Sequence, residues 1–126
     1  VPELCPPDVH DARVAWISHL PQVVSSALAL ALADQDIARS ELGPGGRGVT
    51  RLAGSAADMW TAIALDNGAA IALAIRALEH RLVAARQAID AGDAEAIRQL
   101  FAQAADWAAG LNDPQSPRLT AGATSD

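Results

Sequence analysis

The sequence contains one cysteine, one phenylalanine, no tyrosine and no lysine. The lone Cys5 excludes a disulfide within the chain and suits a reducing cytoplasm, where we expect the protein to reside; we interpret Cys5 as an incidental apolar residue. Aromatic residues make up 3% of the chain although hydrophobic residues make up 51%, with alanine the commonest. Small side chains bury little apolar area each, so we expect the fold to need a partner surface, most simply a second copy of the chain.

Basic residues are few and all nine are arginine, while the net charge is −6. They are scattered apart from one loop. Nucleic-acid binding relies on a basic stripe, so this distribution argues against a nucleic-acid partner.

Long apolar runs are also missing. The longest, residues 23–33, is interrupted by Ser25 and Ser26 and is about half the ~20 residues that a membrane-spanning helix requires. The first seven residues lack the basic start and apolar centre of a signal peptide. We therefore expect neither a membrane partner nor a secretory leader.

The spacing of apolar residues predicts helices, and no stretch shows the alternation of a strand, so the predicted class is all-α. A chain of 126 residues fits one domain and leaves no room for a dinucleotide-binding domain beside these helices. We assign residues 1–114 to a helical domain. Residues 115–126 are polar and patternless and are predicted to form a disordered tail.

The first predicted helix begins at two prolines followed by Asp8, a helix-entry signal, and continues to about residue 38. Pro21 interrupts it. The proline ring clashes with the carbonyl of Ile17 and its missing N–H leaves that carbonyl without a partner. We therefore predict two helical segments joined at a kink.

Capping residues bound the later helices. Ser55, with Asp58 three residues later, is predicted to cap a helix over residues 56–65. A long central helix is predicted to begin at Asn67 and to end at Gly92. The last helix is predicted to begin at Asp93 and to end at Gly110, which is followed by Asn112, Asp113 and Pro114.

Between Glu41 and Ser55 the periodicity stops and glycines cluster, so we predict a flexible loop whose backbone can approach a ligand closely. The loop carries Arg47 and Arg51, with no acidic residue between Glu41 and Asp58. A guanidinium presents paired donors that match a carboxylate, so we expect an anion to bind here. The alternative is a solvated pair of loop arginines.

Ser18, His19 and Gln22 flank Pro21 inside an apolar stripe. Ser18 and Gln22 are four residues apart and share a helix face. Polar groups in such a place are costly unless they are bonded, so these residues form either a structural network or a ligand site.

The tryptophans Trp16, Trp60 and Trp107 are interpreted as anchors of the core or of a dimer interface. His10 and Asp11, at the start of the first helix, are assigned a structural role. No residues have the spacing of a metal site and no nucleophile is paired with a base, so we expect neither a metal nor a catalytic residue in this chain.

Two segments resemble the signatures of the prephenate dehydrogenase family. The first comprises His10, Asp11, Val14, Ala15, Ile17, Ser18, His19, Leu20 and Pro21. The second comprises residues 46–53, Met59, Trp60 and Asn67. The order and separations agree with those of the family, and the similarity covers about residues 8–108.

The resemblance implies an enzyme of tyrosine biosynthesis that oxidatively decarboxylates prephenate, or alternatively arogenate, with NAD or NADP as the cofactor. In that family a Rossmann domain binds the cofactor and supplies the histidine that takes the hydroxyl proton. Neither is present here. The chain would be the C-terminal helical dimerisation domain, of the 6-phosphogluconate-dehydrogenase C-terminal-like type, inactive alone and functional as a homodimer. The competing interpretation is a stand-alone module that senses tyrosine or a related acid, or only dimerises.

The resemblance also assigns substrate-binding residues. Arg51 matches an arginine that grips a substrate carboxylate, and Ser18 matches a serine facing the reacting end of the substrate. Trp60 matches a tryptophan that reaches towards the pocket of the partner subunit. His19 belongs to the motif without a clear role. Gln22 replaces a histidine of many relatives, linked to substrate choice and tyrosine inhibition, and is compatible with an arogenate-type enzyme.

The glycine-rich loop departs from the family pattern. Gly46, Gly48 and Val49 stand where relatives often carry Phe, an acid and Thr. Arg47, also a predicted substrate-binding residue, therefore lacks its usual acidic neighbour.

Overall fold

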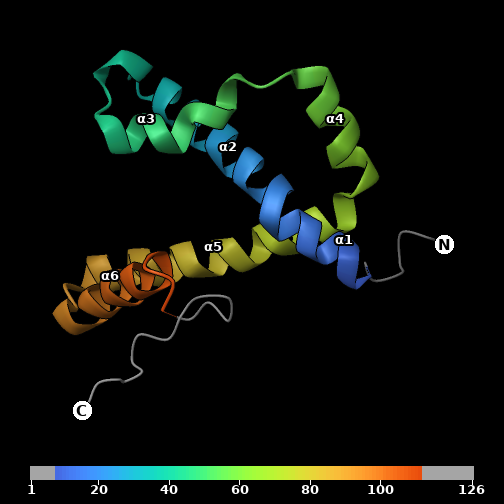
Figure 1. Cartoon of the computed structure of the whole chain (residues 1–126). Helices are drawn as coiled ribbons and strands as arrows, with labels where there is room; N and C mark the ends of the chain where they lie inside the picture. The colour runs from blue at the N-terminus through green and yellow to red at the C-terminus, as the bar shows by residue number, and fades with distance from the viewer. Residues whose placement is uncertain (1–7, 112–126) are drawn as a thin grey trace, which may run out of the picture. The chain divides into compact units, whose positions relative to one another are not determined.

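The computed structural model describes residues 8–111, and every regular element in this range is helical (Figure 1), which confirms the all-α class. The chain divides into two compact units, Val1–Glu79 and His80–Asp126. The elements that begin in the first unit are α1 (Val9–Val14), η2 (Ala15–His19), α2 (Leu20–Asp34), η3 (Arg39–Glu41), α3 (Pro44–Thr50), η4 (Arg51–Gly54), α4 (Ala57–Asp66) and α5 (Gly68–Ala91). The second unit contains the end of α5 and all of α6 (Ala94–Ala108).

Several sequence-based predictions lie outside the described residues. They concern Cys5, the prolines before Asp8, the stop signal at residues 112–114 and the tail at residues 115–126.

The first helix begins as predicted and passes Pro21 without breaking. Asp8 is the N-cap, and its carboxylate accepts a hydrogen bond from the Asp11 amide at 2.8 Å. Before the proline, η2 is a π-helical turn, in which the Leu20 N–H donates to the Ala15 carbonyl five residues back. Such a turn is a common way to insert an irregularity into a helix. The irregularity predicted at Pro21 is therefore a π turn, and the two predicted segments are one continuous helix.

The end of α2 lies earlier than predicted, at Asp34 instead of about residue 38. Asp36 adopts a left-handed backbone with φ of 58°. The amide of Asp36 donates to the Ala33 carbonyl and that of Ile37 donates to the Leu32 carbonyl. This is the hydrogen-bond pattern of a Schellman cap, with aspartate in the position that glycine usually occupies.

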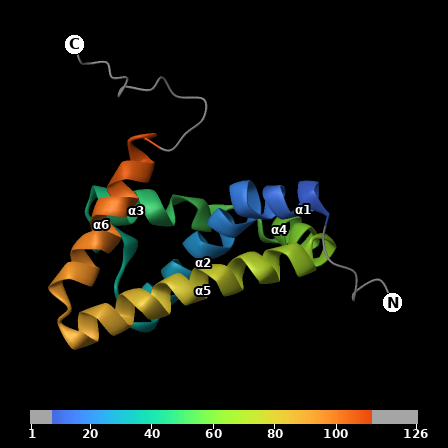
Figure 2. The same ribbon diagram turned by 90° about the horizontal axis from the view of Figure 1, so that it is seen from below.

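The core of the first unit is built mainly from small side chains. The buried apolar residues are Ala15, Leu20, Ala70, Ile71 and Ala74, with Val23, Val24, Ile75 and Leu78 packed against them. Alanines allow the η2–α2 segment and the start of α5 to approach closely, and Figure 2 shows α2 alongside α5. The core is therefore small.

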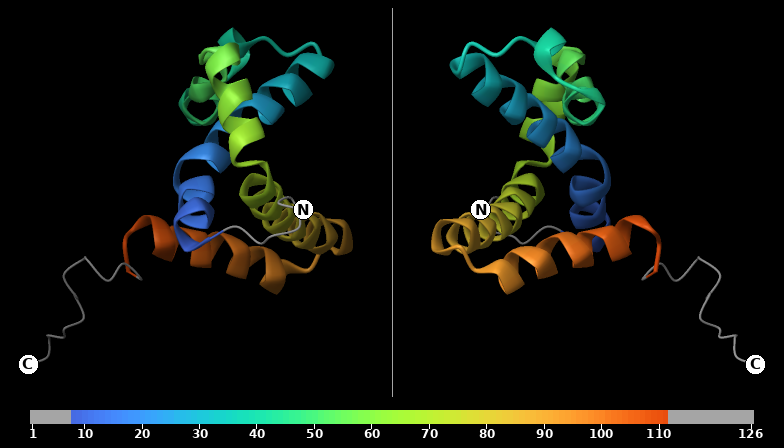
Figure 3. Two further views of the ribbon diagram at one scale, coloured as in Figure 1. Left: turned by 90° about the vertical axis from the view of Figure 1, so that its right-hand side faces the viewer. Right: turned by 90° about the vertical axis from the view of Figure 1, so that its left-hand side faces the viewer.

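The prediction of a loop between Glu41 and Ser55 is wrong over most of its length. The segment forms η3, α3 and η4, and Figure 3 shows it folded back beside the end of α2, with which α3 is in contact. Pro44 starts α3, where its fixed φ suits a first helical turn. Packing on α2 thus outweighs the low helix propensity of the glycines.

One glycine of this segment is required by a close approach, although not to a ligand. A Cβ on Gly46 would lie 3.1 Å from the Cβ of Leu42. Gly46 therefore lets α3 pack tightly against Leu42, which lies just before the helix.

The boundary residues of α4 and α5 differ in part from the predictions. The N-cap of α4 is Ala56, without a side-chain cap, so the assignment to Ser55 is wrong by one residue. Asn67 precedes α5 directly, as predicted, and its carbonyl accepts from the Ile71 amide. Its side-chain amide donates to the Asp11 carbonyl of α1 at 3.1 Å and so links the two helices.

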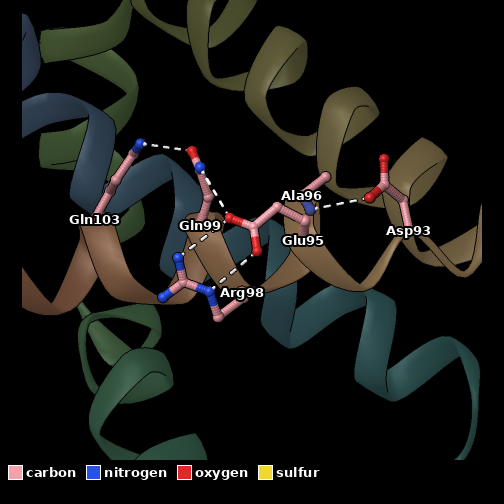
Figure 4. A network of polar contacts seen from close by, with 6 residues as sticks. All are labelled: Asp93, Glu95, Ala96, Arg98, Gln99 and Gln103. Atoms are coloured by element: carbon pink, nitrogen blue, oxygen red, sulfur yellow. Dashed lines mark hydrogen bonds and ion pairs between the residues drawn. The ribbon is translucent and has the colours of Figure 1, made fainter.

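In the second unit, the predicted turn residues are confirmed. Gly92 has a φ of +64°, and Asp93 caps α6 by accepting from the Ala96 amide at 3.1 Å. Figure 4 shows the network that continues from this cap: Glu95 accepts from Arg98 and Gln99. These hydrogen bonds, that of Arg98 first, lower the pKa of the Glu95 carboxyl below 4.5.

The continuous helix Val9–Asp34 is long and apolar enough to cross a membrane by length and composition. Within the described residues, α4 and α5 together pass the same test, but they are bent by 94° where they meet. They would form a second span only if the bent pair were a single broken span. Residues 23–33, the longest apolar run in the sequence, are only part of this helix. The π turn joins the preceding residues to them. Composition alone is a weak indicator, because a helix that packs on a protein core, as Ala15 and Leu20 do here, has the same character.

Candidate functional site

Two cavities of the first unit adjoin η4. The first has a volume of about 400 Å³ and is lined by residues of α2, η3 and η4, including Arg39 and Arg51. The second, of about 410 Å³, is lined by η2, α2, α4 and α5, including His19, Gln22 and Trp60. Both volumes lie in the range of about 300–1,000 Å³ typical of small-molecule sites.

The first cavity carries positive charge without compensation. Its lining residues include two arginines and no acidic residue. The salt bridges within residues 8–111 are Arg86 with Asp90 and Arg98 with Glu95, so neither Arg39 nor Arg51 has an acidic partner there. An anion entering this cavity would not have to displace a carboxylate of the described chain.

Arg39 is held in place by neutral oxygen atoms. Its Nε donates to the Thr50 hydroxyl at 3.3 Å, and its Nη2 donates to the Arg47 carbonyl at 2.9 Å. Thr50 is 3% exposed, and its hydroxyl donates to the Gly46 carbonyl at 2.8 Å. These bonds tie η3 to α3 and orient the Arg39 guanidinium.

Arg51 and Arg47 differ in their contacts. The Arg51 side chain is exposed at the first cavity and has no hydrogen bond or ion pair with another described residue. Arg47 donates to the Ser40 carbonyl at 3.3 Å and lines neither of the two cavities. The residue that shares the cavity with Arg51 is therefore Arg39.

The second cavity contains an aromatic pair next to an ordered amide. The rings of His19 and Trp60 meet edge to face, with centroids 5.9 Å apart. The Asn67 amide nitrogen lies 3.3 Å from His19 Nδ1. The amide nitrogen can only donate, so a hydrogen bond between these atoms requires Nδ1 as the acceptor. Asn67 thereby helps to orient the His19 ring.

Gln22 joins the helix of the second cavity to the backbone beside Arg51. Its side chain is 6% exposed, and its Nε2 donates to the Leu52 carbonyl at 2.7 Å. This bond spans 30 residues of sequence and fixes η4 on α2. Gln22 thus positions the turn that carries Arg51.

The structure brings the six predicted site residues together only in part. His19, Gln22 and Trp60 line one cavity, and Arg51 lines its neighbour. Ser18 is exposed in η2 and lines neither cavity, as is the case for Arg47. The prediction that Ser18 and Gln22 share one face is thus modified by the π turn between them, since Ser18 is exposed and Gln22 is buried.

The other tryptophans are not anchors of the core within one chain. Trp16 is 49% exposed and Trp107 is 75% exposed. Their predicted role at a dimer interface stays a prediction.

Sequence reasoning missed Arg39, Thr50 and the contacts of Asn67. Arg39 lies before Glu41 and therefore outside the predicted cationic segment. In the structure the Glu41 carboxylate accepts from the Ala38 amide at 2.9 Å and does not neutralise Arg39. The spacing of Arg39 and Thr50, eleven residues apart, gave no signal.

No group of three or more His, Cys, Asp or Glu side chains in residues 8–111 could hold a metal ion. The candidate site combines two arginines at one cavity beside η4 with an aromatic pair at the other.

The sequence profile described as the prephenate dehydrogenase dimerization domain matches residues 6–103. The match covers both cavities and all six predicted site residues. The chain therefore belongs to this family.

Proposed function

We propose that this member of the prephenate dehydrogenase dimerization-domain family binds prephenate and forms the homodimer of an NAD(P)-dependent prephenate dehydrogenase. The reaction is the oxidative decarboxylation of prephenate to 4-hydroxyphenylpyruvate in tyrosine biosynthesis, in the cytoplasm. Arogenate is the alternative substrate. The observation that carries the proposal is Arg51 at a cavity without an ion pair or hydrogen bond to another of residues 8–111. By resemblance, Arg51 matches the arginine with which the family grips a substrate carboxylate.

The chemistry of the two cavities supports a cyclic carboxylic acid as the ligand. Arg51 offers paired donors to a carboxylate. In the second cavity, Trp60 and the apolar residues Val23, Leu30 and Ile71 suit a six-membered carbon ring. Binding that fixes the ring and the carboxylate together orients the substrate for reaction.

The cofactor belongs to another part of the enzyme. We assign NAD or NADP to the Rossmann domain that the family resemblance implies, in which a strand leads into a glycine-rich loop that holds the dinucleotide. The role proposed for this chain is to bind and orient the substrate, and no catalytic residue is assigned to it.

Exposed apolar side chains support the homodimer. They include Ile17, Leu30, Leu65, Leu82, Ile89, Phe101 and Trp107, each at least 58% exposed. The small core leaves these side chains without cover in one chain, and a second copy would bury them. An intertwined dimer of the 6-phosphogluconate-dehydrogenase C-terminal-like type is the arrangement that we propose.

The test is Arg51→Ala in the intact enzyme that contains this domain, with cofactor reduction as the readout. Loss of a charge-assisted contact should remove at least ~2 kcal/mol of transition-state stabilisation, which corresponds to a fall in kcat/KM of about 30-fold. Arg86→Ala is the matched control, because Arg86 is 63% exposed and contacts only the exposed Asp90. Unchanged turnover and affinity in Arg51→Ala would remove Arg51 from this role.

Two further outcomes separate the alternatives. Turnover of arogenate without turnover of prephenate would identify the arogenate enzyme. Binding of tyrosine or a related acid without turnover of either substrate would favour the stand-alone sensing module.

A further inference from the structure

We propose that Arg39 is a second carboxylate-binding residue, which together with Arg51 forms a two-arginine site in the first cavity. The proposal rests on the proposed function and adds a residue to it. The ligand is a small cyclic acid with two carboxylates, such as prephenate, and the site binds one of them between two guanidinium groups.

The charge at this cavity is the first argument. Arg39 and Arg51 line the same cavity, and none of its lining residues within residues 8–111 is acidic. Neither arginine forms a salt bridge within residues 8–111. Two like charges brought to one concave surface repel each other, and an anion bound between them relieves that repulsion.

The orientation of Arg39 is the second argument. A guanidinium has five N–H donors, and Arg39 uses one on Nε and one on Nη2 for the Thr50 hydroxyl and the Arg47 carbonyl. Both acceptors are neutral, so they hold the group without cancelling its charge. The two N–H groups of Nη1 and one of Nη2 remain for a ligand, on a side chain already ordered before binding.

The wall around the two arginines is the third argument. Leu32, Ile37 and Leu42 line the cavity with them. Apolar walls displace water and strengthen the attraction between a guanidinium and a carboxylate.

The experiment measures prephenate binding to the full chain by calorimetry, for the unchanged protein and for Arg39→Gln, Arg39→Lys, Arg51→Gln and the control Arg86→Gln. We expect Arg39→Gln to weaken binding about tenfold, the effect of losing one charge-assisted contact. Arg39→Lys, which keeps the charge, should restore a large part of the affinity. Arg86→Gln should bind as the unchanged chain does.

The dependence of binding on salt separates a binding role from a structural one. Removal of a ligand-binding charge should make prephenate affinity less sensitive to salt, because fewer charges attract the ligand. Thr50→Val removes the Nε acceptor of Arg39 but keeps the charge, so it should leave the salt dependence unchanged. Far-ultraviolet circular dichroism confirms that each variant is folded.

The outcomes distinguish this inference from the proposed function. Loss of binding in Arg51→Gln with unchanged binding in Arg39→Gln would overturn the role of Arg39 and leave the proposed function standing. Equal losses in Arg39→Gln and Arg39→Lys with an unchanged salt dependence would show that Arg39 acts only by supporting α3. Unchanged binding in both Arg39→Gln and Arg51→Gln would overturn both proposals.

Discussion

The hydrogen bond from Gln22 to the Leu52 carbonyl makes a quantitative prediction about the turn that carries Arg51. Gln22→Met keeps a side chain of similar length but has no donor for this carbonyl. Gln22 is 6% exposed and its bond to the carbonyl is partly buried, so water is restricted as a replacement partner. We therefore expect the substitution to cost about 1–3 kcal/mol of folding free energy, the range for leaving a buried acceptor unsatisfied.

The assay is urea unfolding followed by circular dichroism at one protein concentration, because dimer formation makes stability depend on concentration. The expected loss lowers the unfolding midpoint without changing the slope of the transition. Gln87→Met is the control, because Gln87 is exposed on α5. This control should change stability by less than ~0.5 kcal/mol.

A second readout tests the positioning of Arg51. Once η4 is released from α2, prephenate affinity should fall in Gln22→Met even at temperatures where the variant is fully folded. Stability and affinity both equal to those of the Gln87→Met control would refute the reasoning, because they would show that the bond neither stabilises nor orients the turn.

Three other substitutions test the local structure. Asp36→Gly should raise stability by about 0.5–1 kcal/mol in the same urea assay, because glycine adopts the left-handed φ of 58° without strain; a loss of stability would contradict the cap. Ser25→Ala should be neutral or stabilising by up to ~1 kcal/mol, because the Ser25 hydroxyl is buried with no hydrogen-bond partner in the described residues, and a clear destabilisation would reveal a partner. Glu95→Gln should destabilise α6 at neutral pH, because hydrogen bonds from Arg98 and Gln99 lower the pKa of the Glu95 carboxyl. This contribution is present above pH 4.5 and is lost as the pH falls through the lowered pKa, so circular dichroism should show the difference from the unchanged protein disappearing in acid.

The parts of the fold that local chemistry determines could be predicted from the sequence. Asp8 and Asp93 cap helices because a carboxylate accepts from amides of the first turn, and Gly92 ends α5 because its backbone is left-handed. The helix through Pro21 was predicted to be irregular at the right place. The form of the irregularity, a π turn, depends on packing around Ala15 and could not be read from the proline alone.

The parts that long-range contacts determine could not be predicted. Glycine content argued for a loop after Glu41, whereas packing on α2 makes α3 helical. Gln22 was predicted to be a site residue from its place beside Pro21, but its bond to Leu52 joins residues 30 apart in sequence. Arg39 was missed for the same reason, since only the folded segment brings it to the cavity of Arg51.

The most direct test of the account is a crystal structure of the intact enzyme with prephenate bound. We expect a carboxylate oxygen of the ligand about 2.9 Å from the Arg51 guanidinium, with the ring in the second cavity beside Trp60. A ligand whose carboxylates both lie away from Arg51, with that guanidinium left in solvent, would contradict it.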